Sequence, residues 1–270
     1  MHREIPGTPK EITVIRHGEE WYACIVCKVT VDEPQDRSHL PSVGIDIGVA
    51  KPIVLSSGDV IMLPQVSLEE RHKLAVLQKK VSRKKKGSRN RKKAIRKLNR
   101  YHKRLSRRRK DGIHKATRKI VNSHGAIFVE NLHVHGMTAS AAGTVDDPGR
   151  NVAQKSGLNR AILDVSPRFI RTCLEYKAKR LGYEVNAVPA PYTSQTCSKC
   201  GFCHADNRKS QSGFVCLKCG YTANADHNAA RNIRYKGLSL YPRTAGAAGI
   251  ACQARRNDAR QQEARAFTPE

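Results

Sequence analysis

The sequence predicts an α/β protein that also carries a basic helical hairpin and a four-cysteine metal-binding module. Three observations support this class. Short β-branched runs with turn signals alternate with longer segments of helical periodicity. One central segment holds most of the excess positive charge, and two Cys-x-x-Cys pairs follow late in the chain. With 270 residues, 39% of them hydrophobic, the chain can bury a substantial core.

The first part of the chain is expected to form strands. Residues 11–31 predict two strands around a His17-Gly18 turn, because β-branched and aromatic residues lie on both sides of a turn signal. Residues 42–64 predict two or three more strands, with a turn at Ser57-Gly58-Asp59. This pattern is typical of the antiparallel start of an α/β domain.

Residues 67–121 predict a helical hairpin with a thin apolar seam. Apolar residues recur there at three-to-four-residue and heptad-like spacing: Leu74, Leu77, Val81, Ile95, Leu98 and Leu105. Gly87-Ser88 separates the two helices. Residues 71–120 contain 24 Lys and Arg against one acid, Asp111, and so hold +23 of the chain's +27. Such an uncompensated surface indicates a polyanionic partner such as nucleic acid.

The second half of the chain predicts further strands and helices. Residues 125–132 form a short apolar strand that ends in Glu130, and 138–156 is expected to be a mobile loop. Residues 158–190 predict helix followed by strand, with Pro167 in the first turn of a helix. Beyond residue 235 we expect disorder, with weak helix near 256–265.

Four cysteines have the spacing of a structural zinc ribbon. Cys197-x-x-Cys200 and Cys216-x-x-Cys219 are separated by fifteen residues, and a glycine follows each pair. Each pair lets one tight turn present two thiolates to the same Zn²⁺. Cys203 offers a competing pairing with Cys200, but the symmetric pairs are preferred. A closed shell of four thiolates organises structure and leaves no position open for catalysis.

Three carboxylates stand in contexts that favour a second metal site. Asp46 lies in the apolar strand "VGIDIGV", Glu130 ends a strand, and Asp226 begins a predicted helix. Each has an ordinary alternative, which is a turn hydrogen bond for Asp46, an ion pair with the basic hairpin for Glu130, and helix capping for Asp226. Together they can converge at one edge of a sheet and bind two Mg²⁺ or Mn²⁺ ions that hydrolyse a phosphodiester.

Cellular location is constrained only by what the chain lacks. No apolar run approaches the roughly 18 to 20 residues that a membrane span needs, and the first residues lack the apolar core of a signal peptide. Nine cysteines form no evident disulfide framework. We therefore expect a cytoplasmic protein that has no membrane partner.

Four stretches occur in this order: "VGIDIGVAKP", "IFVENLHVHGM", "LNRAILDVSPRFIRTCLEYKAKRLGYEV" and "TSQTCSKCG…FVCLKCGYTANADHNAARNI". Together they resemble the TnpB family of transposon-encoded proteins, which are compact relatives of type V CRISPR effector nucleases. The resemblance extends from about residue 8 to residue 234. It implies a RuvC-like nuclease domain with an RNase H fold, in which Asp46, Glu130 and Asp226 match the three acidic motifs. It also implies Mg²⁺-dependent cleavage of DNA directed by a guide RNA.

The resemblance also suggests a domain organisation. Residues 1–36 would be the last strands of an N-terminal β-barrel, so the chain resembles a family member that is truncated at its N-terminus. A RuvC-like core would occupy 41–190, including the basic hairpin at 67–121. A zinc ribbon at 191–222 would be inserted before a final helix at 223–234, and 235–270 would be a disordered tail. Guide RNA, target motif and oligomeric state do not follow from the sequence.

Two other functions compete with the nuclease. A non-cleaving nucleic-acid-binding protein, or an inactive transposon remnant, would use the same basic hairpin and ribbon. A ribosome-associated zinc-ribbon protein would explain the charge but not the three acids. The acid trio favours the nuclease, because a purely binding function does not require acids where phosphates approach.

Overall fold

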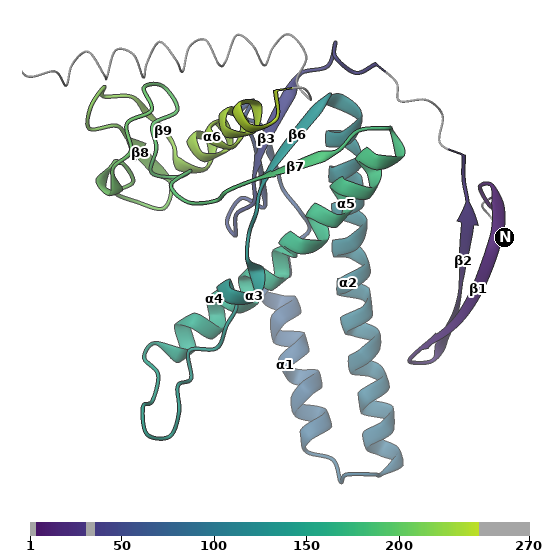
Figure 1. Cartoon of the computed structure of the whole chain (residues 1–270). Coiled ribbons are helices and arrows are strands. Elements are labelled where there is room, and N and C mark those ends of the chain that lie inside the picture. Colours follow the sequence, from purple (N-terminus) through teal and green to yellow (C-terminus); the bar gives the residue numbers. More distant parts are fainter. Residues whose placement is uncertain (1–3, 31–35, 243–270) are drawn as a thin grey trace, which may run out of the picture. The chain divides into compact units, whose positions relative to one another are not determined.

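The structure is a computed structural model that describes residues 4–30 and 36–242 (Figure 1). Its described residues form two compact units. The hairpin unit comprises the described residues within the ranges 1–35, 66–108 and 180–182. The sheet unit comprises the described residues within the ranges 36–65, 109–179 and 183–270.

The hairpin unit contains two of the predicted features. Its elements are the antiparallel strands β1 (Thr8–His17) and β2 (Glu20–Lys28), the helix α1 (Leu68–Ser82) and the first part of α2 (Arg89–Ser123). Gly18 turns the strand pair with φ 68°, a conformation that glycine adopts without strain. The predicted strand pair and helical hairpin are therefore confirmed.

Acids of the hairpin unit are paired with basic residues of α2. Ser67 and Glu70 form a capping box at the start of α1, and Glu70 also accepts two hydrogen bonds from Arg108, at 2.7 and 2.6 Å. Glu20 binds Lys103 and Arg107. Most other basic side chains on α2 remain exposed, while Leu105 is buried. The seam is thus thin, as predicted.

The sheet unit is built on a mixed five-stranded sheet of order β5-β4-β3-β6-β7. The strands are β3 (Ser42–Asp46), β4 (Ile53–Leu55), β5 (Val60–Ile61), β6 (Ala126–Glu130) and β7 (Val185–Val188). Strands β3, β6 and β7 are parallel, while β4 and β5 are antiparallel to their neighbours. The structure thus confirms an α/β class with the predicted antiparallel start.

The remaining elements of the sheet unit follow in chain order. They are α3 (Val134–Met137), α4 (Val152–Val165), α5 (Pro167–Arg180), the 3₁₀ turn η1 (Ala205–Asn207), β8 (Gly213–Val215), β9 (Thr222–Asn224) and α6 (Ala225–Leu240). Pro167 begins α5, as predicted. The long hydrophobic residues of β3 and β6 are almost fully buried.

Helix α6 covers one face of the sheet, and its contacts identify that face (Figure 1). A Cβ atom on Gly44 would lie 2.2 Å from the backbone oxygen of Ala230, and one on Gly237 would lie 2.1 Å from the Phe128 ring. Only glycine allows so close an approach. Side chains alternate along a strand, so the residues two positions beyond Gly44 and Phe128 face the same side.

Two expectations about segment ends were wrong. The predicted loop at 138–156 ends earlier, because α4 begins at Val152. The expected disorder after 235 does not hold for residues 235–240, which continue α6. Leu238 explains the extension, because it is buried in a core cluster with Phe128 and Ile233. The expectations for 243–270, including weak helix near 256–265, concern residues outside those that the structure describes.

Candidate active site and metal centre

Asp46 and Glu130 end two neighbouring parallel strands in matching register. Ile45 on β3 pairs with Val129 on β6, so the residues that follow them lie side by side at the carboxyl ends of the strands. They are also two positions beyond Gly44 and Phe128, and therefore face the side covered by α6. Neighbouring strands are about 4.8 Å apart, so the backbone alone brings the two acids together.

Asp226 lies in the first turn of α6, but it does not cap the helix. Asn224 is the N-cap, and its side chain accepts hydrogen bonds from the backbone N–H groups of Asp226 and His227. The capping alternative for Asp226 is therefore wrong, because the residue two positions earlier already satisfies those donors. This leaves the Asp226 carboxylate available for another interaction.

The three acids, here called the carboxylate site, influence one another. Burial, followed by the negative charges of Glu130 and Asp226, raises the pKa of Asp46 to about 7. Arg208 and the backbone N–H of Ile47 oppose that shift. Burial also raises the pKa of Glu130, against the opposing effects of Thr193, Lys236 and Arg208.

Arg208 and Thr193 support the carboxylate site, although neither is among the residues predicted from the sequence. A terminal nitrogen of Arg208 lies 3.9 Å from an oxygen of Asp226. The buried hydroxyl of Thr193 is within hydrogen-bonding distance of both the Glu130 carboxylate and the Ala190 carbonyl oxygen, and with one proton it can donate to only one of them at a time. Neither residue carries a sequence signal, because each reaches the acids through the fold.

The carboxylate oxygens do not form a compact ligand set. Within residues 4–30 and 36–242, the four cysteines are the only group of three or more potential ligands whose donor atoms all lie within 4.8 Å of one another. The acids nevertheless fit a divalent cation chemically, because three largely buried carboxylates face only two cations, Arg208 and Lys236, among the groups that shift their pKa values, and hard cations prefer carboxylate oxygens.

The four predicted cysteines come together as a possible metal centre. The Sγ atoms of Cys197 and Cys219 are 3.8 Å apart, and those of Cys200 and Cys216 are 3.6 Å apart. Four sulfurs bound tetrahedrally at about 2.3 Å from Zn²⁺ would be about 3.8 Å apart, so the spacing fits this ion. Cys203 is exposed and lies outside the group.

Each cysteine pair sits in the same kind of turn. The N–H of Gly201 donates to the Cys197 carbonyl oxygen at 2.9 Å, and the N–H of Gly220 donates to that of Cys216 at 3.0 Å. Both glycines have positive φ, 80° and 68°. These turns match the expectation that a glycine after each pair allows the chain to reverse.

The cysteine ribbon, whose paired strands β8 and β9 end at Asn224, is anchored to the start of α6. Ala225, the first residue of α6, is buried with Cys197, Cys216 and Phe214. The side chain of Asn228 accepts a hydrogen bond from the Ser198 N–H at 2.9 Å and donates one to the Thr196 carbonyl oxygen at 2.8 Å. The cysteine cluster thereby fixes the helix turn that carries Asp226.

The fold and the two ligand sets define a class of protein, an α/β protein with a mixed sheet that carries three acids beside a four-cysteine ribbon. Comparison with known families agrees with this class. Residues 24–141 match the OrfB_IS605 family model, described as a probable transposase, and residues 168–233 match the Cas12f1-like TNB domain. Residues 24–141 therefore match the family of transposon proteins to which the TnpB resemblance pointed.

Several relatives are similar over most of the chain. The "Putative RNA-guided DNA endonuclease InsQ" of Escherichia coli K12 is 44% identical over 88% of this chain and 59% of its own length. A protein of Streptomyces pristinaespiralis with the same description is 33% identical over 86% of this chain and 54% of its own length. The chain thus spans little more than half the length of these two relatives.

Two further similarities concern CRISPR-associated proteins. The endodeoxyribonuclease Cas12f1 of Sulfoacidibacillus thermotolerans is 44% identical over 27% of this chain and 19% of its own length. The solved Cas12f1–sgRNA–target DNA complex matches with a TM-score of 0.42 and 24% identity, over 83% of this chain and 55% of that one. Separately, no helix among the described residues is both long and apolar enough to cross a membrane.

Proposed function

We propose that this chain carries the nuclease centre of a transposon-encoded DNA endonuclease of the RuvC type, with an RNase H-like fold. In complete form the enzyme would take a guide RNA, as the descriptions of the E. coli and Streptomyces relatives suggest. The observation that carries the proposal is the register of β3 and β6, which aligns Asp46 with Glu130 on the face where α6 presents Asp226.

The carboxylate site supports a metal-dependent reaction. When bound by these acids, two Mg²⁺ or Mn²⁺ ions would supply an activated water and stabilise the leaving oxygen of a phosphodiester. The protein's contribution is to hold Asp46 and Glu130 at strand ends and Asp226 in a helix turn, so that little ordering is needed. The Thr193 hydroxyl would orient Glu130, and Arg208 would place a positive charge beside the phosphate.

The cysteine ribbon and the basic helices have supporting functions in this proposal. Zn²⁺ in the four-cysteine cluster would stabilise the ribbon that packs on the start of α6. The exposed Lys and Arg side chains of α1 and α2 would bind the phosphates of guide RNA or DNA without reading sequence.

A cleavage assay tests the proposal. The purified chain, with RNA transcribed from a transposon end, is incubated with fluorescent single-stranded and R-loop DNA in Mg²⁺ or Mn²⁺. Asp46→Asn should reduce cleavage on the order of 10³-fold, because loss of a metal ligand costs several kcal/mol. Asp146→Asn, which alters an exposed loop acid, is the matched control and should cleave normally.

The same assay identifies the competing function. If the wild-type chain binds these nucleic acids but does not cut them with either metal ion, the endonuclease proposal is wrong and the non-cleaving binding protein is supported. If Asp46→Asn cuts as fast as the wild type, the carboxylate site is not the nuclease centre.

A further inference from the structure

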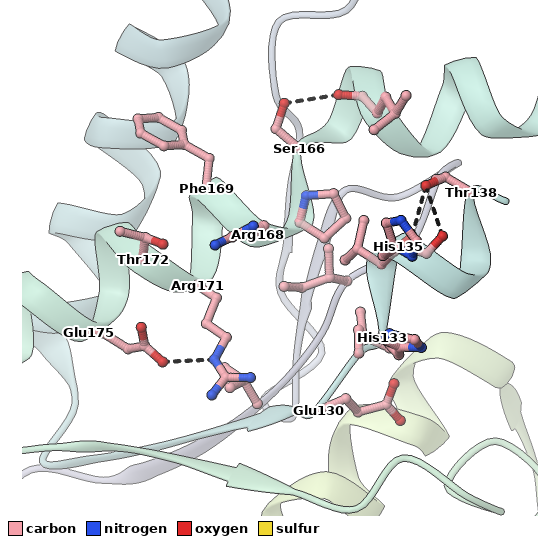
Figure 2. Close-up of a pocket in the computed structure, with 16 residues that line it drawn as sticks. Glu130, His133, His135, Thr138, Ser166, Arg168, Phe169, Arg171, Thr172 and Glu175 are labelled. Atoms are coloured by element: carbon pink, nitrogen blue, oxygen red, sulfur yellow. Dashed lines mark hydrogen bonds and ion pairs between the residues drawn. The ribbon is translucent and has the colours of Figure 1, made fainter.

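A cleft of about 890 Å³ in the sheet unit carries two neighbouring histidines, His133 and His135 (Figure 2). They lie in the segment 131–135, which leads from β6 into α3. Leu132 and Val134 are half-buried there, while both histidines are exposed. Both imidazoles therefore turn away from the interior, and they line the same wall of the cleft.

The two rings are close enough to bind one metal ion together. Their centres are 6.2 Å apart. An imidazole nitrogen binds a transition metal at about 2.0 to 2.1 Å, which puts the ring centre about 3.2 Å from the ion and two such centres at most about 6.4 Å apart. A tetrahedral ion would draw the centres to about 5 Å, and the broad χ2 torsion of an exposed histidine allows that movement.

Ring nitrogens of both histidines are available to a ligand. Among the described residues, neither imidazole has a hydrogen bond or an ion pair. The ring of His133 packs against Gly136, where a Cβ atom would lie only 2.7 Å from Nδ1. Glycine thus leaves the space that this ring occupies, and Nε2, on the far side of the ring, is the nitrogen that remains open.

The ligand type selects the class of ion. Imidazole nitrogen suits Ni²⁺, Cu²⁺ and Zn²⁺, whereas Mg²⁺ prefers oxygen ligands. The histidine pair therefore differs in chemistry from the acids of the carboxylate site and from the thiolates of the ribbon. Figure 2 shows His133 on the side of the pair nearer Glu130, and both residues line the same cleft.

We propose that His133 and His135 together bind one late first-row transition metal ion, with water completing its coordination. After the first imidazole has bound, the second is already held close to the ion, so the pair should bind far more tightly than either histidine alone. The site contains no residue of the carboxylate site or of the cysteine cluster. It therefore does not depend on the proposed function.

The first test measures Ni²⁺ binding by isothermal titration calorimetry. The chain is loaded with Zn²⁺ and kept in excess Mg²⁺, so that Ni²⁺ competes poorly for the thiolates and the carboxylates. His133→Asn and His135→Asn, made singly, should each weaken the tightest Ni²⁺ site by at least about 10-fold, the lower end of what even an outer-shell change costs at a metal site. The double variant should lose little more than either single variant, because one imidazole cannot chelate.

The matched control removes two exposed imidazoles that stand on different helices, in the variant His72→Asn with His102→Asn. It should bind Ni²⁺ as tightly as the wild type. Because the substituted histidines are all exposed, melting temperatures without Ni²⁺ should stay unchanged. Added Ni²⁺ should raise the melting temperature of the wild type and the control by more than that of His133→Asn.

The second test leaves both imidazoles in place. Gly136→Ala puts a methyl group where the His133 ring lies, so it should displace that ring and weaken Ni²⁺ binding. In a chain labelled with ¹⁵N at histidine, Zn²⁺ added beyond the amount that the cysteines take up should shift the ring nitrogens of His133 and His135 first. Those of His72 and His102 should move only at higher concentrations.

The outcomes separate this inference from the proposed function. Equally tight Ni²⁺ binding in the wild type and in the His133→Asn, His135→Asn double variant would overturn the site. Single variants that each lose only half of the bound Ni²⁺, with unchanged affinity for the rest, would also overturn it, because the two histidines would then bind independently. Joint loss of Ni²⁺ binding supports the site, and it does so even if the wild type fails to cleave DNA and the nuclease proposal is wrong.

Discussion

Acids in the two units of this protein have opposite electrostatic environments. In the hairpin unit, hydrogen bonds from Lys103 and Tyr22 lower the pKa of Glu20 to about 2, whereas in the sheet unit burial and neighbouring acids raise the pKa of Asp46 to about 7. The chain carries 50 Lys and Arg, so cations are plentiful. The contrast shows that basic residues stabilise the charged form of Glu20, whereas burial and neighbouring acids disfavour the charged form of Asp46, which a bound divalent cation would stabilise.

The largest expected effect comes from disrupting the cysteine cluster, which supports the helix turn that carries Asp226. Cys216→Ser should lose the bound metal and unfold the ribbon, because structural zinc contributes about 10 to 16 kcal/mol in small zinc modules. Cleavage should fall with it, since Ala225 packs directly on the cysteine cluster. Elemental analysis and limited proteolysis measure the loss. Cys203→Ser, which alters the exposed cysteine outside the cluster, should keep about one zinc per chain; equal zinc loss in both variants would contradict the assignment.

Arg208 tests whether the carboxylate site tolerates the loss of the cation beside Asp226. Arg208→Gln removes the positive charge 3.9 Å from Asp226 and should slow cleavage about 10- to 100-fold, equivalent to roughly 1.4 to 2.7 kcal/mol of transition-state stabilisation. Single-turnover kinetics measure the change. The neighbouring exposed residue provides the control, Lys209→Gln, whose rate should be that of the wild type. Equal rates for the wild type and Arg208→Gln would show that this arginine has no part in the reaction.

The sequence already contained the side chains that make up the carboxylate site and the cysteine cluster. The Cys-x-x-Cys spacing specified the four cysteines because each pair forms one local turn, which nearby residues determine. The acids were recognisable from their places at strand ends and at a helix start. Their alignment was not, because the register that sets Asp46 beside Glu130 depends on strand pairing over more than 80 residues of chain.

Two residues that support the acids, Thr193 and Arg208, could not be predicted, because their contacts also depend on tertiary packing. Thr193 and Arg208 reach the acids only after the ribbon has packed on α6. Asn224 was a missed local signal, since asparagine two residues before Asp226 is a strong N-cap candidate. The early start of α4 was hidden by an Ala-, Gly- and Asn-rich stretch that resembles a loop.

Asp46 and Glu20 should affect the free energy of unfolding in opposite directions, because folding disfavours the charged form of Asp46 and favours that of Glu20. In buffer without added Mg²⁺, Asp46→Asn should raise the free energy of unfolding by on the order of 1 kcal/mol, because it removes a buried charge that other acids repel. Mg²⁺ should then raise the melting temperature of the wild type but not of the variant. Differential scanning calorimetry measures both. A destabilised Asp46→Asn would mean that the carboxylate is satisfied in the folded protein.

The smallest expected effect concerns Glu20. Its pKa is lowered from 4.5 to about 2, so its ion pairs contribute stability above pH 4.5 and lose that contribution as the pH falls from 4.5 toward 2. Because Glu20 is exposed, the change in melting temperature should be slight, and the carboxyl ¹³C resonance is the better measurement. Lys103→Gln should move the Glu20 pKa back toward 4.5, whereas Lys97→Gln, at an exposed position of α2, should not. An unshifted Glu20 in Lys103→Gln would show that this pairing does not neutralise the acid, and the contrast with Asp46 would then rest only on the burial of Asp46 and on its neighbouring acids.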